Sequence, residues 1–67
     1  MGKEYQMALA DLCSTRNWPP PEYEVIGSLN SYLCTVRVYD IKYRGEPAQS
    51  RNQAKEKAAA VAYHSLK

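Results

Sequence analysis

The chain has 67 residues, and a chain of this length buries only about 60% of the surface that its unfolded form exposes, so we expect one small domain over residues 1–67. Its composition excludes a membrane-spanning helix, which needs roughly 20 apolar residues, and a disulfide framework, for which two cysteines are too few. We expect reduced, buried thiols in an intracellular compartment, cytoplasmic or nuclear. Residues 1–35 contain two basic and four acidic side chains (net −2), and residues 36–67 contain seven basic and three acidic side chains (net +4). This asymmetry favours a negatively charged partner on one face.

The first predicted element is a helix over residues 3–15. Its apolar residues recur at spacings that place them on one face of a helix, namely Tyr5, Ala8, Leu9, Leu12 and Cys13. The three prolines at 19–21 end the helix, because proline has no backbone N–H and disfavours the α region for the residue before it. We interpret these prolines as a stiff corner of the fold, in preference to a ligand for a proline-binding domain.

Three strands are predicted to follow the corner. Residues 23–26 form a short strand, and residues 27–31 form a loop rich in residues that tolerate turns. In residues 32–39, Cys34, Val36 and Val38 alternate with more polar positions, which is typical of a half-buried strand. A tight turn at Asp40 then leads to a third strand over residues 41–44.

A final helix is predicted after Ser50. Ser50 is a suitable N-cap, and Gln53 stands three residues later, as in a capping box. The apolar stripe of this helix consists of Ala54, Ala58, Val61, Ala62 and Leu66. The order of elements is therefore α-β-β-β-α. We expect an α+β fold in which a three-stranded antiparallel sheet carries both helices on one face.

A polar and cationic cluster lies at the start of the final helix. Arg51 and Lys55 are one turn apart, and Asn52 lies beside them, off the apolar stripe. A helix N-terminus already carries about half a positive charge and free N–H donors, so cations there slightly destabilise the helix. Folding does not explain such a cluster, whereas binding of a phosphate group does. The alternative is a solvated basic face.

Catalysis and metal binding are not expected. The only histidine, His64, lies near the end of the last helix, where an imidazolium is stabilised by the helix dipole. Cys13, Cys34 and His64 lack the local spacing of a zinc site, and the carboxylates are scattered singly. We expect no enzyme activity, no metal and no cofactor.

The final helix resembles a known family. Its sequence Ser-Arg-Asn-x-Ala-Lys-x-x-Ala-Ala is similar to the Ser-Lys-Lys-x-Ala-Lys-x-x-Ala-Ala signature of double-stranded RNA-binding domains. Residues 9–12 resemble the family's Leu-x-Glu-Leu in the first helix, residues 21–23 resemble its Pro-x-Tyr at the first strand, and Tyr32 stands where it usually has Phe. The resemblance covers roughly residues 4–66.

This resemblance implies binding of double-stranded RNA by shape and phosphate contacts, with little sequence preference and modest affinity. Arg51 and Lys55 would bridge the two phosphate ridges that flank the narrow major groove of duplex RNA, and Asn52 would donate one neutral hydrogen bond.

Two minor-groove contacts are also implied, which together with the phosphate contact span about 16 base pairs. In the first helix, Met7 would be an apolar contact and Asp11 would accept from a 2′-hydroxyl. The loop after the first strand would enter the next minor groove through Ser28 and Asn30.

The loop departs most from the family. Gly-Pro-x-His is represented only by residues 27–31, which have neither proline nor histidine, and Asn52 replaces a lysine. The alternative hypothesis is a protein-interaction or dimerisation module of the same fold with weak or lost RNA binding. Its contact surface would be Tyr39 and Tyr43, on the face of the sheet opposite the helices, or an exposed edge of the first helix.

Overall fold

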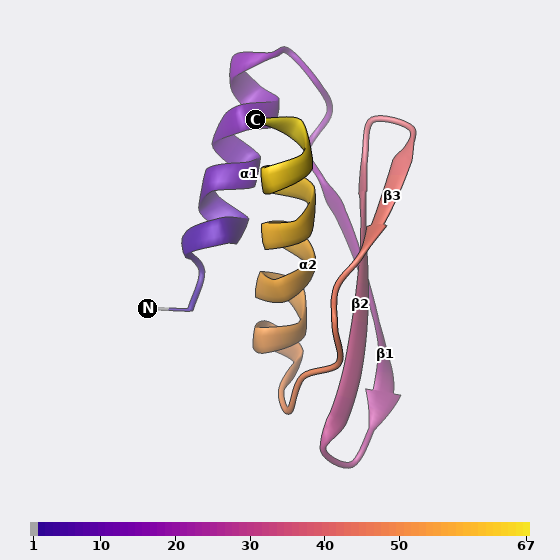
Figure 1. Ribbon diagram of the computed structural model, residues 1–67. Helices are drawn as coiled ribbons and strands as arrows, with labels where there is room; N and C mark the ends of the chain where they lie inside the picture. The colour runs from indigo at the N-terminus through magenta and orange to yellow at the C-terminus, as the bar shows by residue number, and fades with distance from the viewer. Residues whose placement is uncertain (1) are drawn as a thin grey trace.

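In the computed structural model, which describes residues 2–67, two helices cover one face of a three-stranded antiparallel sheet (Figure 1). The strand order is β1-β2-β3. The α-β-β-β-α prediction is confirmed, with elements at α1 (Glu4–Thr15), β1 (Glu22–Ser28), β2 (Ser31–Val38), β3 (Ile41–Arg44) and α2 (Arg51–Leu66).

The core lies between the sheet and the helices and is built largely from small side chains. Its buried apolar residues are Leu9, Cys13, Cys34, Val36, Val38, Ala48, Ala54, Ala58, Ala59 and Ala62. The predicted alternation in β2 is confirmed, since Cys34, Val36 and Val38 are all buried. Alanines along α2 allow its backbone to approach both α1 and the sheet closely. Both cysteines are free thiols, and burial raises the pKa of each.

The predicted apolar stripe of α2 is wrong at one residue. Val61 is 40% exposed, whereas Ala59, outside the predicted stripe, is fully buried. The reason is that α2 has neighbours on two sides, the sheet and α1. Ala59 lies on the side of α2 that faces α1, where Tyr63 also meets Tyr5 (ring centroids 6.2 Å apart), so the buried face is rotated toward α1.

The predicted length of the loop at residues 27–31 is also wrong, because β1 and β2 both extend further than expected. Ser28 of β1 pairs with Ser31 of β2, so only Leu29 and Asn30 form the turn. Gly27 has φ +141, and a Cβ there would collide with the Ser31 carbonyl oxygen. Glycine is therefore what allows β2 to pair with β1 up to the turn.

Gly45, the residue after β3, lies close to the backbone of α2. It is buried, and its N–H donates to the Cys34 carbonyl at 3.1 Å. A Cβ at this position would lie 2.5 Å from the backbone nitrogen and 2.8 Å from the Cα of Ala58. Only glycine leaves room for α2 at this position.

Tyr23 of β1 has a buried hydroxyl that makes no hydrogen bond within the described part of the chain. Burial raises the pKa of Tyr23 from 10.0 to about 12, with smaller effects from Cys34 and Glu56. The folded protein therefore holds this proton more tightly than the unfolded chain. This contribution to stability is complete below pH 10 and is lost as the pH rises toward 12.

We expect Tyr23→Phe to raise the free energy of unfolding at pH 7 by about 1 kcal/mol, because an unpaired buried hydroxyl is removed. Between pH 10 and 12, the variant should lose less stability than the parent, because it lacks the Tyr23 hydroxyl. Urea denaturation of the two proteins across this pH range measures the difference. Equal losses of stability would contradict the assignment.

Candidate nucleic-acid interface

The β1–β2 turn and the start of α2 are far apart in the sequence but lie together at the lower end of the molecule in Figure 1, and α1 begins beside α2, higher in this view. Two backbone hydrogen bonds between Tyr32 and Ala48, of 2.8 and 2.9 Å, join the start of β2 to the segment that leads into α2. The fold thus brings together the segments that carry the residues selected from the sequence.

The start of α2 is capped as predicted by Ser50, whose Oγ accepts from the Gln53 N–H at 3.1 Å. No acidic side chain occupies the first turn of α2. The Arg51 guanidinium lies over the Tyr32 ring, 5.7 Å from its centroid. Sequence analysis did not identify Tyr32 as the support for Arg51, because the two residues are brought together only by the fold.

Arg51 is exposed and Lys55 is half-buried. Neither side chain forms an ion pair with another residue between positions 2 and 67. Two cations without acidic partners beside the positive end of a helix dipole repel that dipole. A phosphate group bound here would satisfy both cations and the free N–H groups of the first turn.

Asn52 is directed toward the beginning of α1. Its Nδ2 donates to the Gly2 carbonyl at 2.7 Å, and its Oδ1 accepts from Gln6 Nε2 at 3.2 Å. The side chain remains exposed. Contact of Asn52 with RNA stays a prediction, and it would have to share the amide with these partners.

Glu56 has a role that the sequence did not reveal. Its Oε2 accepts from the Tyr5 N–H at 2.6 Å, and its Oε1 accepts from the Gln6 N–H at 3.2 Å. Lys3, at the N-cap position of α1, provides no side-chain cap. A carboxylate from α2 therefore caps α1 across the interface between the helices. No local signal announces such a cap, because its partners are 51 and 50 residues away.

Met7 and Asp11 lie one turn apart on the solvent side of α1. Met7 is 69% exposed, and Asp11 is exposed as well. Burial in the core therefore does not account for the methionine, and both side chains are accessible to a ligand.

Ser28, the last residue of β1, and Asn30, in the β1–β2 turn, are both exposed, and between them lies a residue that sequence analysis missed. Leu29 is 89% exposed and has a left-handed backbone, with φ 56. An apolar side chain in this conformation contributes little to folding and costs backbone energy. The available signal was a leucine within a run of turn-forming residues.

The tyrosines assigned to a protein contact are placed differently from the prediction. Tyr43 pairs with Val36 and packs against the core, so it lies on the helix side of the sheet. Tyr39 lies in the turn between β2 and β3 and stacks on Trp18 at 5.7 Å. The prediction that both occupy the face of the sheet opposite the helices is therefore wrong. Tyr39 lies outside the strands, and Tyr43 is on the helix side because residues directly opposite each other in paired strands share a face.

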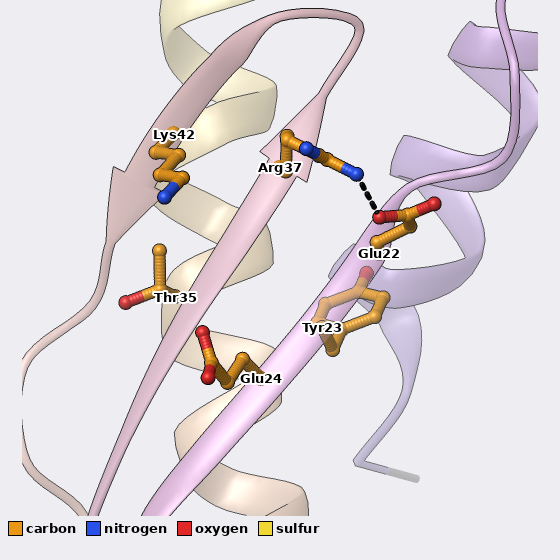
Figure 2. A pocket seen from close by; sticks show the side chains of 6 residues that line it. All are labelled: Glu22, Tyr23, Glu24, Thr35, Arg37 and Lys42. Carbon is orange, nitrogen blue, oxygen red and sulfur yellow. Dashed lines mark hydrogen bonds and ion pairs between the residues drawn. The ribbon is translucent and has the colours of Figure 1, made fainter.

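The open face of the sheet carries both acidic and basic side chains. A shallow pocket there is lined by Glu22, Tyr23, Glu24, Thr35, Arg37 and Lys42 (Figure 2). Arg37 and Glu22 form an exposed ion pair across β1 and β2 (Figure 2). The mixed charge makes this face a poorer anion site than the start of α2.

Three further observations concern His64, metal ligands and membrane-spanning helices. His64 Nε2 lies 3.2 Å from the Tyr5 hydroxyl, so the imidazole contacts α1. Over residues 2–67 there is no group of three or more histidine, cysteine, aspartate or glutamate side chains placed to hold a metal ion. No helix in the described chain is long and apolar enough to cross a membrane.

Comparisons with known proteins agree with the α-β-β-β-α fold. A family model described as double-stranded RNA binding motif matches residues 5–66. Double-stranded RNA-binding protein 6 of Oryza sativa subsp. japonica is 31% identical over 67 residues, which cover 94% of this chain but only 13% of that protein.

Several solved structures with 25% sequence identity to this chain have a similar fold. An Arabidopsis HYL1 structure, with its implications for miRNA processing, superposes with a TM-score of 0.86 over 94% of this chain and 96% of that chain. The dsRBD of tRNA-dihydrouridine(20) synthase has a TM-score of 0.86 over 91% of this chain and 68% of that chain. The two dsRBDs of DRB4 with their linker give 0.77 over 96% and 44%. The chain belongs to the double-stranded RNA-binding motif family.

Proposed function

We propose that this chain binds double-stranded RNA by its A-form shape and its phosphates, with little sequence preference and modest affinity. The observation that carries the proposal is the pair Arg51 and Lys55, which have no acidic partners within residues 2–67 and flank the capped start of α2. The family match supports the same ligand. The chain spans only 13% of the length of this curated relative.

In this mechanism, α2 binds across the narrow major groove of duplex RNA, where two phosphate ridges approach each other. Arg51 offers a planar guanidinium that can form two parallel hydrogen bonds to one phosphate, while Lys55 contributes a mobile point charge. The Tyr32 ring stacks against the Arg51 guanidinium and limits its movement. The free N–H groups of the first turn add donors to the same ligand.

The two minor-groove contacts come from α1 and from the β1–β2 turn. Asp11 accepts a hydrogen bond from a 2′-hydroxyl, and Met7 lies against the shallow groove floor. Ser28, at the end of β1, and Asn30, in the β1–β2 turn, reach the next minor groove along the duplex. The turn has only two residues, so its contact is small and the affinity is modest.

Competition against a labelled RNA duplex of about 20 base pairs tests the ligand class, since the motif spans about 16. Unlabelled RNA duplexes of unrelated sequence should compete within a few-fold of one another, because groove width and phosphate spacing do not encode base identity. A matched DNA duplex should compete distinctly less well, because it has no 2′-hydroxyl and its phosphate ridges are spaced differently. Single-stranded RNA should also be weak, since the contact side chains are not an aromatic stacking platform.

Two other results of this competition experiment would contradict the proposed ligand. Equal competition by DNA and RNA duplexes would reduce the activity to non-specific binding by a basic patch. Absence of binding to all three nucleic acids would overturn the proposal and leave protein interaction as the function of the fold.

A further inference from the structure

Three polar side chains join the N-terminal ends of the two helices, and we call Gln6, Asn52 and Glu56 the helix clasp. Gln6 Nε2 donates to Glu56 Oε1 and to Asn52 Oδ1, both at 3.2 Å. Glu56 also accepts the N–H groups of Tyr5 and Gln6. Asn52 reaches the Gly2 carbonyl, as does Gln6 at 3.4 Å. The clasp therefore connects the first turn of α1 with the first two turns of α2.

Stability alone does not require this arrangement. A serine or aspartate at position 3 would cap α1 locally, whereas Lys3 makes no side-chain cap. A local cap would satisfy the same N–H groups but would leave α1 free to shift along α2. A cap donated by Glu56 ties the start of α1 to one point on α2.

Each member of the clasp is the sequence neighbour of a side chain in the proposed interface. Gln6 precedes Met7, Asn52 follows Arg51, and Glu56 follows Lys55. Neighbouring residues on a helix are about 100° apart around its axis, so the clasp and the interface occupy adjacent strips of both helices. The clasp thus sets the position of the minor-groove side chains relative to the phosphate-binding side chains.

We propose that Glu56 is a positioning residue for RNA recognition, which acts through the clasp to fix the distance between the minor-groove contact of α1 and the phosphate contact of α2. That distance is a property in which A-form and B-form duplexes differ. Glu56 therefore contributes to the preference for RNA over DNA without contacting the ligand. The inference rests on the proposed function.

The test compares Glu56→Ala, Glu56→Gln and the control Val38→Ala, well below the unfolding temperature of each protein. The readout is the ratio of affinities for RNA and DNA duplexes of equal length. Loss of the negative charge of Glu56 strengthens binding to both duplexes, so the ratio removes this electrostatic effect. Val38 is the buried last residue of β2, and the end of β2 lies away from the start of α2 (Figure 1). Its truncation should destabilise the fold without changing a residue of the clasp.

Glu56→Ala should lower the RNA preference about fivefold, the scale of one lost hydrogen-bonded contact. The salt dependence of RNA binding should be unchanged, because Arg51 and Lys55 remain. Glu56→Gln retains an oxygen acceptor and should recover most of the preference, and Val38→Ala should keep the parent ratio. In the Glu56→Ala background, Met7→Ala should cost less RNA affinity than in the parent, since the two residues act through one contact.

The outcomes separate this inference from the function on which it rests. A parent that prefers RNA and a Glu56→Ala variant with the same preference would overturn the positioning role alone. Equal loss in the Ala and Gln variants would mean that an oxygen acceptor at position 56 does not restore the RNA preference, and it would also overturn the positioning role. A parent that binds neither duplex would overturn the proposed function itself.

Discussion

Replacement of both Arg51 and Lys55 by alanine should reduce the affinity for duplex RNA about a hundredfold or more. Each charge-assisted hydrogen bond contributes about 1.5–3 kcal/mol, and this variant removes both cations that face the phosphate ridges. Binding that remains should depend less on salt, with the slope of log affinity against log salt concentration reduced by roughly two units. The fold should persist, because neither side chain forms an ion pair within residues 2–67 and the only stacking partner lost is Tyr32.

Fluorescence titration of a labelled duplex at several salt concentrations measures both effects. The matched control is Lys42→Ala with Arg44→Ala, which removes the same charge from β3 rather than from α2. This control should lose only the small long-range attraction that any cation provides. If both double variants weaken binding equally, total charge rather than the start of α2 is responsible. Parent-like binding by the Arg51 and Lys55 variant would remove this surface from the interface.

Gly45→Ala should destabilise the protein by about 3 kcal/mol, at the upper end of what overpacking costs. The new methyl group would meet the Ala58 backbone at 2.5–2.8 Å, and a helix backbone cannot move aside as a flexible side chain can. A chain of 67 residues is expected to be stable by only about 3–10 kcal/mol. The substitution should therefore remove a large share of the total stability.

Urea denaturation followed by circular dichroism measures the change in the free energy of unfolding. Glu46→Ala, at the exposed neighbouring position, is the control and should differ from the parent by less than about 0.5 kcal/mol. A Gly45→Ala variant with parental stability would mean that the segment after β3 can withdraw from α2 without loss. RNA affinity of the folded fraction should remain near the parental value, because Gly45 lies outside the interface.

Local chemistry determined the order of the elements and their identity. The 3.6-residue spacing around Leu9 predicted α1, the alternation around Val36 predicted β2, and Ser50 predicted the start of α2. Each of these signals depends on residues within one or two turns, or within one strand. The cluster at Arg51 and Lys55 could likewise be found from sequence, because it conflicts with the dipole of its own helix.

The tertiary structure decided the features that depend on residues distant in sequence. Glu56 caps α1 because folding brings it to Tyr5, 51 residues away. Ala59 is buried and Val61 is exposed because α1 covers one side of α2. A helical stripe shows that a helix has an apolar face, but which side chains bury depends on the neighbours that pack against it. Polar contacts between helices require donors and acceptors that meet only after packing, so the clasp has no signature in the sequence.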